Sequence, residues 1–225
     1  MTERACICVF ARPAILGQTK TRLAAAVGDA AAADLARAFF ADAWASAHKQ
    51  PNAQCVLATT AQPGGTLNLS PDTEVWLQGQ GDLGARIERI LRRGLAAEPL
   101  AFAVAADVPG LPPRLWHAAR QLLKEADAVI GPCDDGGFYL LGLRRCPPGL
   151  LAAVPWSAAE TCARTVARLE AAGMRVRQLE PWFDIDELPD LWRFRGLLQR
   201  GDVVAPNTRQ VLADLATAGI DVGQG

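Results

Sequence analysis

Residues 74–105 read EVWLQGQGDLGARIERILRRGLAAEPLAFAVA and contain the alternation on which the fold prediction rests. The short run Glu74–Leu77 is strand-like, the amphipathic run Leu83–Ala97 is helix-like, and the apolar run Leu100–Ala105 is again strand-like. A strand, a helix and a second strand in this order are typical of a parallel sheet with a helical crossover. The stretch therefore predicts an α/β protein.

The same alternation continues on both sides of this unit. Further strand-like runs are Ala5–Ala11, Gln54–Thr60, Ala128–Ile130, Phe138–Leu143 and Arg175–Leu179, and further helix-like runs are Ala30–His48, Pro113–Lys124, Ala158–Ala171, Leu188–Gln199 and Arg209–Ala218. The turn-rich stretch from Gln62 to Thr73 is expected to be a loop within the fold. We predict one domain over residues 1–225, with a mainly parallel twisted sheet and helices on both faces.

The composition excludes several classes of protein. The chain has 225 residues, of which 50% are hydrophobic and 21% are charged, and this balance is that of a globular protein, not a disordered one. Lys and Arg number 23 against 24 Asp and Glu, which gives a net charge of −1. This balance lacks the positive field that drives sequence-independent binding to nucleic acid. We therefore expect no nucleic-acid partner.

The cysteines and the N-terminal residues point to a cytoplasmic protein. Ala5–Ala11 is too short for a membrane span and is expected to be a first β-strand, not a signal peptide. The six cysteines contain no C-x-x-C, and the two histidines lie far apart in the sequence, so a structural zinc site is not expected. We expect the thiols to be reduced and no segment to cross a membrane.

The loop after the first strand carries closely spaced cations. Residues 10–23 read FARPAILGQTKTRL and contain Arg12, Gly17, Lys20 and Arg22. Ligands of such sheets bind at the carboxyl ends of the strands, where loop N–H groups, Lys20 and Arg22 could hold phosphates. The loop is not a P-loop, because G-x-x-x-x-G-K-[ST] is absent. A solvated surface loop remains the alternative.

A second glycine-bearing loop, Gly79–Gly84, matches the G-x-G-x-x-G pattern of dinucleotide-binding sites. It lies in the middle of the chain and not at the first strand–helix turn, and an ordinary turn followed by a helix start explains it as well. Arg86 follows this loop closely enough to be a phosphate ligand, although a solvated stripe of arginines on the helix is the simpler interpretation.

Acidic residues follow two further apolar segments. Asp107 comes at the end of the run Leu100–Ala105, where a carboxylate could hold Mg²⁺, or could cap the helix that begins near Pro113. Asp184 and Asp186 would share one face of an extended segment and offer a second metal or base position. Capping of the helix that follows them is the alternative.

The segment Asp134-Asp135-Gly136-Gly137 places two acids before two glycines. Paired glycines allow a ligand to approach the backbone closely, and the acids could bind sugar hydroxyls or assist with a metal. A tight hairpin turn explains the glycines equally well but the two acids less well.

Taken together, these segments resemble a known family. The pattern F-A-K-x-P-x-x-G-x-V-K-T-R-L corresponds roughly to residues 10–23, Q-G-x-G-D-L-G-x-R to 78–86, D-x-P-x-L to 107–111, G-P-x-x-D-G-G-[YF]-x-L-L-G-L to 131–143, W-S to 156–157, and D-[VI]-D to 184–186. The chain resembles the bacterial glycosyltransferase-like family of radical-SAM/selenodomain-associated transferases, type 1. That family is itself similar to the nucleotide-diphospho-sugar transferases with the GT-A fold.

The resemblance implies a role for each matching segment. Lys20 and Arg22 would face the phosphates of a nucleotide, Asp107 would be the metal aspartate, and Asp135, Gly136 and Gly137 would line the donor or acceptor pocket. Gly79–Gly84 would be the family's own loop, which argues against NAD or FAD binding. The chain departs from the pattern at Arg12, Thr19, Ala106, Val108 and Glu187.

These observations together give one hypothesis for the site. The expected catalytic residues are Asp107, Asp135 and Asp186; the nucleotide- or phosphate-binding residues are Arg12, Gly17, Lys20, Arg22, Asp82 and Arg86; the substrate-pocket residues are Asp134, Gly136 and Gly137; and the ligands for Mg²⁺ or Mn²⁺ are Asp107, Asp184 and Asp186. Asp135 or Asp186 would serve as the general base.

The expected function is a metal-dependent transferase that takes an activated nucleotide, most specifically a glycosyltransferase with a nucleotide-sugar donor and a small-molecule acceptor. One alternative is a nucleotidyltransferase similar to the 2-phospholactate and molybdenum-cofactor guanylyltransferases, which would release pyrophosphate from a triphosphate. A second is a nucleotide-binding module without catalysis, because the residues beside Asp107 depart from the pattern. A dehydrogenase is the last alternative.

Overall fold

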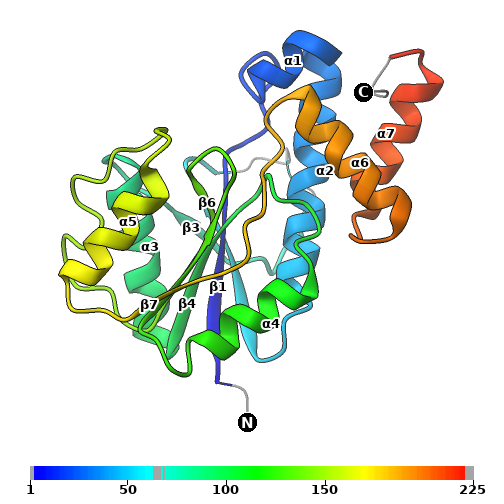
Figure 1. The fold of residues 1–225 in the computed structure, drawn as a ribbon. Coiled ribbons are helices and arrows are strands. Elements are labelled where there is room, and N and C mark those ends of the chain that lie inside the picture. Colours follow the sequence, from blue (N-terminus) through cyan, green and yellow to red (C-terminus); the bar gives the residue numbers. More distant parts are fainter. Residues whose placement is uncertain (1–2, 63–66, 68, 221–225) are drawn as a thin grey trace.

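The computed structural model describes residues 3–62, 67 and 69–220, and its centre is a sheet of seven strands (Figure 1). The strands are β1 (Ala5–Ala11), β2 (Ala53–Thr59), β3 (Val75–Leu77), β4 (Leu100–Ala105), β5 (Ala128–Pro132), β6 (Phe138–Leu143) and β7 (Val176–Gln178). Their order across the sheet is β3-β2-β1-β4-β6-β5-β7. The sheet confirms the predicted α/β class.

Most neighbouring strands run parallel. β1 pairs in parallel with β2 and β4, β2 with β3, and β5 with β7, whereas β6 is antiparallel to both β4 and β5. Ala5 lies opposite both Ala53 and Leu100, so the three central strands begin at the same level. Their carboxyl ends consequently meet at one edge of the sheet, and the loops that follow them lie close together.

Helices cover both faces of the sheet. They are α1 (Thr21–Val27), α2 (Asp29–His48), α3 (Leu83–Ala97), α4 (Pro113–Leu122), α5 (Thr161–Ala171), α6 (Leu188–Arg200) and α7 (Pro206–Thr217). In Figure 1, α2 and α4 lie on one side of the sheet and α3 and α5 on the other. Side chains of a strand alternate between its faces, so Phe102 packs in the core with α2 and α4 while Ala101 packs in the core with α3 and α5.

The secondary structure agrees with the sequence prediction except in a few places. The predicted bounds of Leu83–Ala97, Leu100–Ala105 and Phe138–Leu143 are those of α3, β4 and β6. Helix α1 is not among the predicted elements. The helix expected over Ala158–Ala171 begins only at Thr161, whose hydroxyl oxygen accepts from the backbone N–H of Ala158 at 3.2 Å. Part of the loop expected over Gln62–Thr73 lies outside the described residues.

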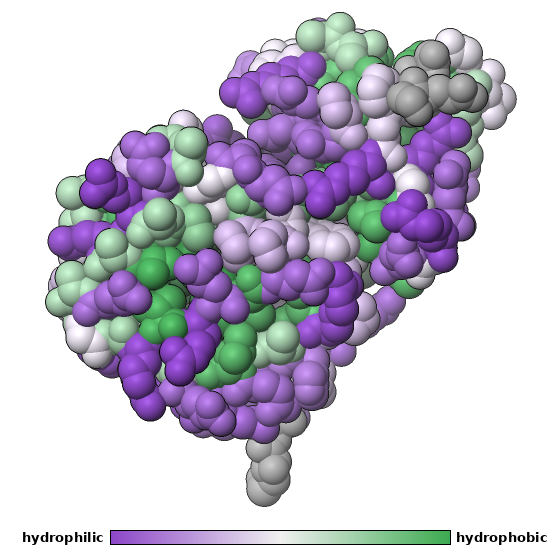
Figure 2. Space-filling view, viewed as in Figure 1, coloured by the Kyte–Doolittle hydropathy of each residue, from purple (hydrophilic) through white to green (hydrophobic). Residues whose placement is uncertain are grey.

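The last two helices cross back over α2 and form a lobe with α1 at the carboxyl ends of the central strands (Figure 1). Asp42 of α2 anchors this lobe because its buried carboxylate accepts four hydrogen bonds from Asn207 and Thr208 at the start of α7. Figure 2 shows mainly hydrophilic residues, and an indented surface, where the lobe meets the sheet. The lobe thus forms one wall beside the edge at which ligands are expected.

The cysteines are unpaired, and the described helices include no membrane span. All six cysteines are free thiols, and Cys6 and Cys8 point to the same buried side of β1 with their sulfur atoms 3.6 Å apart. Among the described helices, none combines the length and the apolar character needed to cross a bilayer.

Candidate functional site

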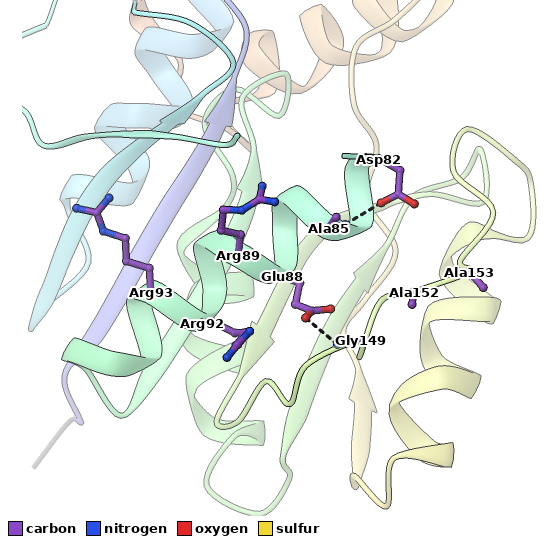
Figure 3. Close-up of a pocket in the computed structure, with 9 residues that line it drawn as sticks. All are labelled: Asp82, Ala85, Glu88, Arg89, Arg92, Arg93, Gly149, Ala152 and Ala153. Atoms are coloured by element: carbon purple, nitrogen blue, oxygen red, sulfur yellow. Dashed lines mark hydrogen bonds between the residues drawn. The ribbon is translucent and has the colours of Figure 1, made fainter. Parts of the chain in front are cut away.

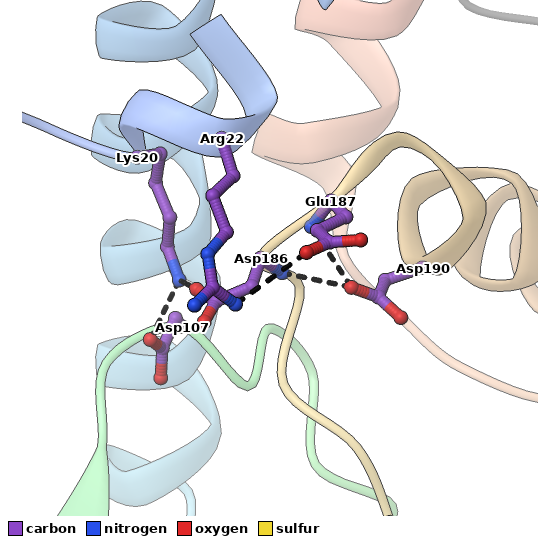
Figure 4. Close-up of polar contacts among 6 residues, drawn as sticks. All are labelled: Lys20, Arg22, Asp107, Asp186, Glu187 and Asp190. Carbon is purple, nitrogen blue, oxygen red and sulfur yellow. Dashed lines mark hydrogen bonds and ion pairs between the residues drawn. The ribbon is translucent and has the colours of Figure 1, made fainter. Parts of the chain in front are cut away.

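Residues from three distant parts of the chain converge at the carboxyl ends of β1 and β4. Lys20 ends the loop after β1, Asp107 follows β4, and Asp186 precedes α6. The Lys20 ammonium donates to Asp107 Oδ2 at 2.7 Å and also to Asp186 Oδ1 (Figure 4). The structure therefore brings together three residues that the sequence predicted separately for phosphate binding, catalysis and metal binding.

Local backbone structure fixes the position of Lys20. The preceding turn is closed by Thr19, whose hydroxyl oxygen accepts from the N–H of Ile15 at 2.8 Å and whose hydroxyl donates to the Ile15 carbonyl at 2.9 Å. Lys20 itself has a left-handed backbone conformation, with φ of 49°, and α1 begins immediately after it. Such a conformation is uncommon for a residue other than glycine and is maintained here by the surrounding contacts.

The carboxylates of Asp184 and Asp186 lie close to each other and to that of Asp107. Ile185 between them is fully buried, and its N–H donates to the Asp107 carbonyl at 3.1 Å. This backbone bond joins the segment to the loop after β4. One carboxylate oxygen from each of Asp107, Asp184 and Asp186 lies within 4.8 Å of the other two. We call these three residues the acidic cluster.

The acidic cluster contains more negative charge than its neighbour Lys20 can balance. Burial, together with the nearby carboxylates of Asp107 and Asp186, raises the pKa of Asp184 to about 7. Burial alone would lower the pKa of Lys20, but the charges of Asp107 and Asp186 outweigh that effect and raise it. Lys20 therefore stays protonated, while Asp184 tends to hold a proton near neutral pH.

The acidic cluster fits a divalent metal ion. Its three carboxylates are hard oxygen ligands, which Mg²⁺ and Mn²⁺ prefer, and their spacing allows one ion to contact all of them. Cys133, Asp135 and Asp184 form a second group whose ligand atoms also lie within 4.8 Å of one another. Asp184 belongs to both groups. Asp135, which the sequence predicted as a catalytic residue, therefore lies beside the acidic cluster.

Helix capping does not account for the acids. Pro112 is the residue that precedes α4, so Asp107 is not its cap. Glu187 caps α6 and forms a reciprocal capping box with Asp190, and the N–H groups of Asp186 and Glu187 both donate to Asp190. The carboxylates of Asp107 and Asp186 are therefore not the caps of α4 and α6.

The segment Asp134–Gly137 is a hairpin turn between β5 and β6. Cys133 and Gly137 are joined by a backbone hydrogen bond of 2.9 Å, and Asp135 Oδ1 accepts from the Gly137 N–H at 2.8 Å. Gly136 has φ of 88°, and a β-carbon there would lie 1.9 Å from the Ala159 carbonyl oxygen. Close packing against the segment before α5 thus requires this glycine. Asp134 forms an ion pair of 2.5 Å with Arg193.

The other predicted phosphate ligands occupy different surroundings. Arg12 is exposed, and Gly17 lies beside the carboxylate of Asp29, because a β-carbon at Gly17 would be 3.6 Å from Asp29 Oδ2. Arg22 is exposed and is 3.4 Å from Glu187 Oε1 (Figure 4). Arg12, Gly17 and Arg22 remain predicted ligands, and of them Arg22 lies beside the acidic cluster.

Asp82 and Arg86 hold the start of α3. Asp82 caps the helix by accepting from the Ala85 N–H at 2.8 Å, and Arg86 Nε donates to the Gly81 carbonyl at 2.8 Å. The loop Gly79–Gly84 is thus a turn that starts a helix. These contacts hold both side chains at the loop itself, and a binding role for either residue remains a prediction.

A cavity of about 590 Å³ lies between α3 and residues 149–153, away from the acidic cluster (Figure 3). Its arginines diverge in Figure 3, and two of them have protein partners. Arg89 donates to the carbonyls of Gln78 and Gln80, while Arg93 stacks over the Trp76 ring at 4.1 Å. The arrangement matches the solvated arginine stripe considered from the sequence better than a convergent phosphate site.

Sequence reasoning misses several residues of the site. Glu187 and Asp190 are not among the predicted residues, because the usual capping box has Ser or Thr at the N-cap and Glu or Gln at N3, whereas this one has Glu and Asp. Cys133 and Arg193 are not predicted either. Cys133 lies far along the chain from Asp184, and Arg193 lies far from Asp134. No local signal therefore indicates these two contacts, and only the fold reveals them.

Comparison with protein families identifies the family. Residues 42–158, just over half of the chain, match the family described as "Uncharacterized protein conserved in bacteria (DUF2064)". The chain belongs to this bacterial family. The matched region includes Asp107 and the hairpin Asp134–Gly137, whereas Lys20 and Asp186 lie outside it. A search of curated proteins found no match.

Comparison with solved structures identifies the wider fold. A protein of Desulfovibrio desulfuricans G20, provisionally assigned as a nucleotide-diphospho-sugar transferase, is 26% identical, with a TM-score of 0.82 over 95% of both chains. CMP:2-keto-3-deoxy-manno-octonic acid synthetase, solved with CTP, has 13% identity and a TM-score of 0.59 over 88% of this chain and 99% of its own.

A nucleotidyl transferase of Methanothermobacter thermautotrophicus is 17% identical, with a TM-score of 0.54 over 88% of this chain and 99% of that chain. At such low identity, this enzyme and the synthetase demonstrate a shared fold. The family and the fold together identify the chain as a member of a bacterial family that is similar to the nucleotide-diphospho-sugar transferases. All three of these solved structures are described as transferases or synthetases that use nucleotides or nucleotide sugars.

Proposed function

We propose that this protein is a metal-dependent transferase that takes its transferred group from a nucleotide sugar. One observation carries the proposal: Lys20 reaches the acidic cluster at the carboxyl ends of β1 and β4. A cation-rich loop beside clustered carboxylates can bind a diphosphate together with a divalent ion, and this edge of the sheet is where ligands of such folds bind.

Asp107, Asp184 and Asp186 would hold the metal ion, Mg²⁺ or Mn²⁺. When bound, the ion supplies positive charge that neutralises the oxygens of the leaving diphosphate. Asp184 must give up its proton to serve as a ligand, and its pKa of about 7 places that loss near neutral pH. We therefore expect metal affinity to rise as the pH rises through 7.

Lys20 and Arg22 would contact the phosphates. Lys20 is protonated, and only 13% of its side chain is exposed, so its charge is poorly screened by water. Phosphate oxygens would compete with Asp107 and Asp186 for the same ammonium. Arg22 is exposed, and its contact to Glu187 is long, so it could turn toward a second phosphate oxygen.

Asp186 or Asp135 would accept the proton of the acceptor hydroxyl. The Asp186 side chain is 44% exposed, so an acceptor can reach its carboxylate. Asp135 is exposed on the hairpin turn, and its Oδ1 accepts from the Gly137 N–H, which leaves Oδ2 to face an acceptor. Either residue would act as a general base on the side of the cluster that is open to solvent.

A second candidate is nucleotidyl transfer, in which a substrate attacks the α-phosphate of a triphosphate and pyrophosphate leaves. Its support is the fold shared with CMP:2-keto-3-deoxy-manno-octonic acid synthetase and with the nucleotidyl transferase of Methanothermobacter. The same lysine and acids would serve this reaction, because both reactions develop negative charge on departing phosphates.

Product analysis separates the two candidates. The protein is incubated with Mg²⁺, a panel of nucleotide sugars or triphosphates and a set of small hydroxyl- and phosphate-bearing acceptors, and the released nucleoside diphosphate and pyrophosphate are quantified. The proposal predicts diphosphate release from one nucleotide sugar, with loss of that release in Asp107→Asn and retention in Asp214→Asn, an exposed carboxylate on α7. Pyrophosphate release alone would favour the second candidate, and equal activity of both variants would contradict the assigned site.

A further inference from the structure

A second cavity lies at the opposite edge of the sheet. It has a volume of about 150 Å³ and is bounded by Glu3, Leu100, His117 and Arg120 of α4, and Lys124 just after that helix. Figure 1 shows the N-terminal end of the described chain and α4 at this edge, and α1 and α6 at the other. Since β4 has six residues at about 3.3 Å each, the cavity is separated from Asp107 by roughly 20 Å.

Arg120 is the unusual residue of this cavity. Only 7% of it is exposed, and its Nη1 donates a hydrogen bond to the Glu3 carbonyl at 2.9 Å. Its Nε and Nη2 are buried and have no hydrogen-bond partner among the described residues. A guanidinium has five N–H donors and keeps its charge, so leaving buried donors unpaired destabilises the folded state.

No carboxylate neutralises Arg120 in the described structure. The carboxylate of Glu3, which borders the cavity, is engaged by Arg144, which donates to its two oxygens at 3.1 and 2.5 Å. The Cys55 thiol lies close enough to interact with Arg120, but burial raises its pKa to about 12, so it carries no charge at neutral pH. Lys124 adds a second positive charge to the cavity wall.

We propose that this cavity binds a phosphate group, either as free phosphate or as part of a small phosphate ester. Phosphate oxygens would supply the acceptors that Arg120 lacks, after a small shift of its side chain into the cavity, and they would pair with Lys124. His117 offers a further ring nitrogen at the wall. The distance from the acidic cluster places this binding site outside the group-transfer reaction.

Thermal unfolding in phosphate tests the proposal, because a ligand of the native state raises its melting temperature. Phosphate is compared with chloride at equal ionic strength for the wild type, Lys20→Met, Arg120→Met and Arg114→Met. The Arg114→Met control removes an exposed arginine of the same helix that is paired with Glu180 and lies outside the cavity. Lys20→Met removes the ammonium proposed to bind phosphate at the other site.

The expected result is a phosphate-dependent rise in melting temperature in the wild type, Lys20→Met and Arg114→Met, and a clearly smaller rise in Arg120→Met, which keeps only the site at Lys20. No rise in the wild type, or the same rise in Arg120→Met, would overturn the proposal. Loss of the whole rise in Lys20→Met would also overturn it, because binding would then be confined to the acidic-cluster site.

The histidines provide a readout on the unmodified protein, which remains valid if Arg120→Met does not fold. The chain has two histidines, His48 and His117, and of these His117 lines the cavity. At fixed pH, phosphate should shift the ring proton resonances of His117 and leave those of His48 in place. Unchanged His117 resonances at saturating phosphate would contradict the site.

Discussion

Asp42 and the acidic cluster hold carboxylates in two different ways within one protein. Asp42 is 2% exposed, and its two oxygens accept four hydrogen bonds of 2.7–3.1 Å from Asn207 and Thr208. In the acidic cluster, three carboxylates lie around the ammonium of Lys20, and burial together with mutual repulsion raises the pKa of Asp184 to about 7.

The difference separates a structural carboxylate from a functional one. The bonds of Asp42 are complete within the chain, so its contribution is to hold α7 against α2. Lys20 alone does not balance the three carboxylates of the acidic cluster, and a cation from outside the chain would supply the remaining positive charge. Substitutions at the two places should therefore affect different properties, activity at the cluster and stability at Asp42.

The largest effect is expected for Asp107→Asn. Removal of this charge should lower turnover by on the order of 10²–10³-fold, because it removes a metal ligand and a partner of Lys20. The melting temperature should change little, since Asp107 does not cap α4. Steady-state kinetics and thermal unfolding of the same preparation provide the check. A large loss of stability with unchanged turnover would reverse the assignment of the two regions.

Asp42→Ala should instead lower the stability of the folded protein. The substitution leaves the N–H groups of Asn207 and Thr208 without their acceptor, and we expect a loss of about 2–4 kcal/mol in the free energy of unfolding. Urea denaturation measures it. Asp214→Ala is the matched control on α7, and its exposed carboxylate should contribute less than about 0.5 kcal/mol. Equal losses in both variants would contradict the anchoring role of Asp42.

Lys20→Met should change two affinities in opposite directions. Without the ammonium, the acidic cluster should bind Mg²⁺ more tightly, and a nucleoside diphosphate should bind more weakly, each by about tenfold, or about 1.4 kcal/mol. Calorimetric titration measures both constants. Lys49→Met, which removes an exposed lysine after α2, should alter neither. A parallel fall in both affinities would show that Lys20 does not compete with the metal.

An effect of similar size is expected in the pH dependence of stability. Asp184 keeps its proton up to a pH of about 7 in the folded protein, whereas the ordinary pKa of an aspartate is 3.8. The folded state thus binds more protons between these values, so this group's contribution to stability is greatest below pH 3.8 and falls as the pH rises to 7.

Asp184→Asn should remove this contribution, which we expect to be about 1–2 kcal/mol because the site is partly open to water. Urea denaturation of both proteins, without divalent metal, measures the free energy of unfolding at about pH 4.5 and about pH 7.5. Most of the pH-dependent change expected from Asp184 falls between these two values. Identical pH dependence in the two proteins would show that the pKa of Asp184 is not raised by its surroundings.

The fold could be predicted from the sequence where hydrophobic periodicity is strong. The helix Leu83–Ala97 and the strand Leu100–Ala105 are both evident from apolar spacing. Helix α1 escapes prediction because it has only seven residues and starts after Lys20 in a left-handed conformation, which no sequence pattern indicates. The antiparallel direction of β6 is also inaccessible, since an apolar run does not encode the direction of a strand.

The individual residues of the site could be predicted, but their contacts could not. Asp107 and Lys20 stand out because each follows a strand of a parallel sheet, and they lie 87 positions apart in the chain. The choice between metal binding and helix capping for Asp186 depends on the position of the true cap, Glu187. Local sequence supports both interpretations equally, and the folded geometry excludes capping by Asp186.

Binding of Mn²⁺ tests the central claim most directly. Electron paramagnetic resonance follows the signal of free Mn²⁺ during titration of the wild type, Asp107→Asn, Asp186→Asn and the control Asp214→Asn. We predict that the wild type and the control bind alike, and that each cluster variant binds at least about tenfold more weakly because it loses a charged ligand. Equal binding by all four proteins would contradict the assignment of the acidic cluster as the metal site.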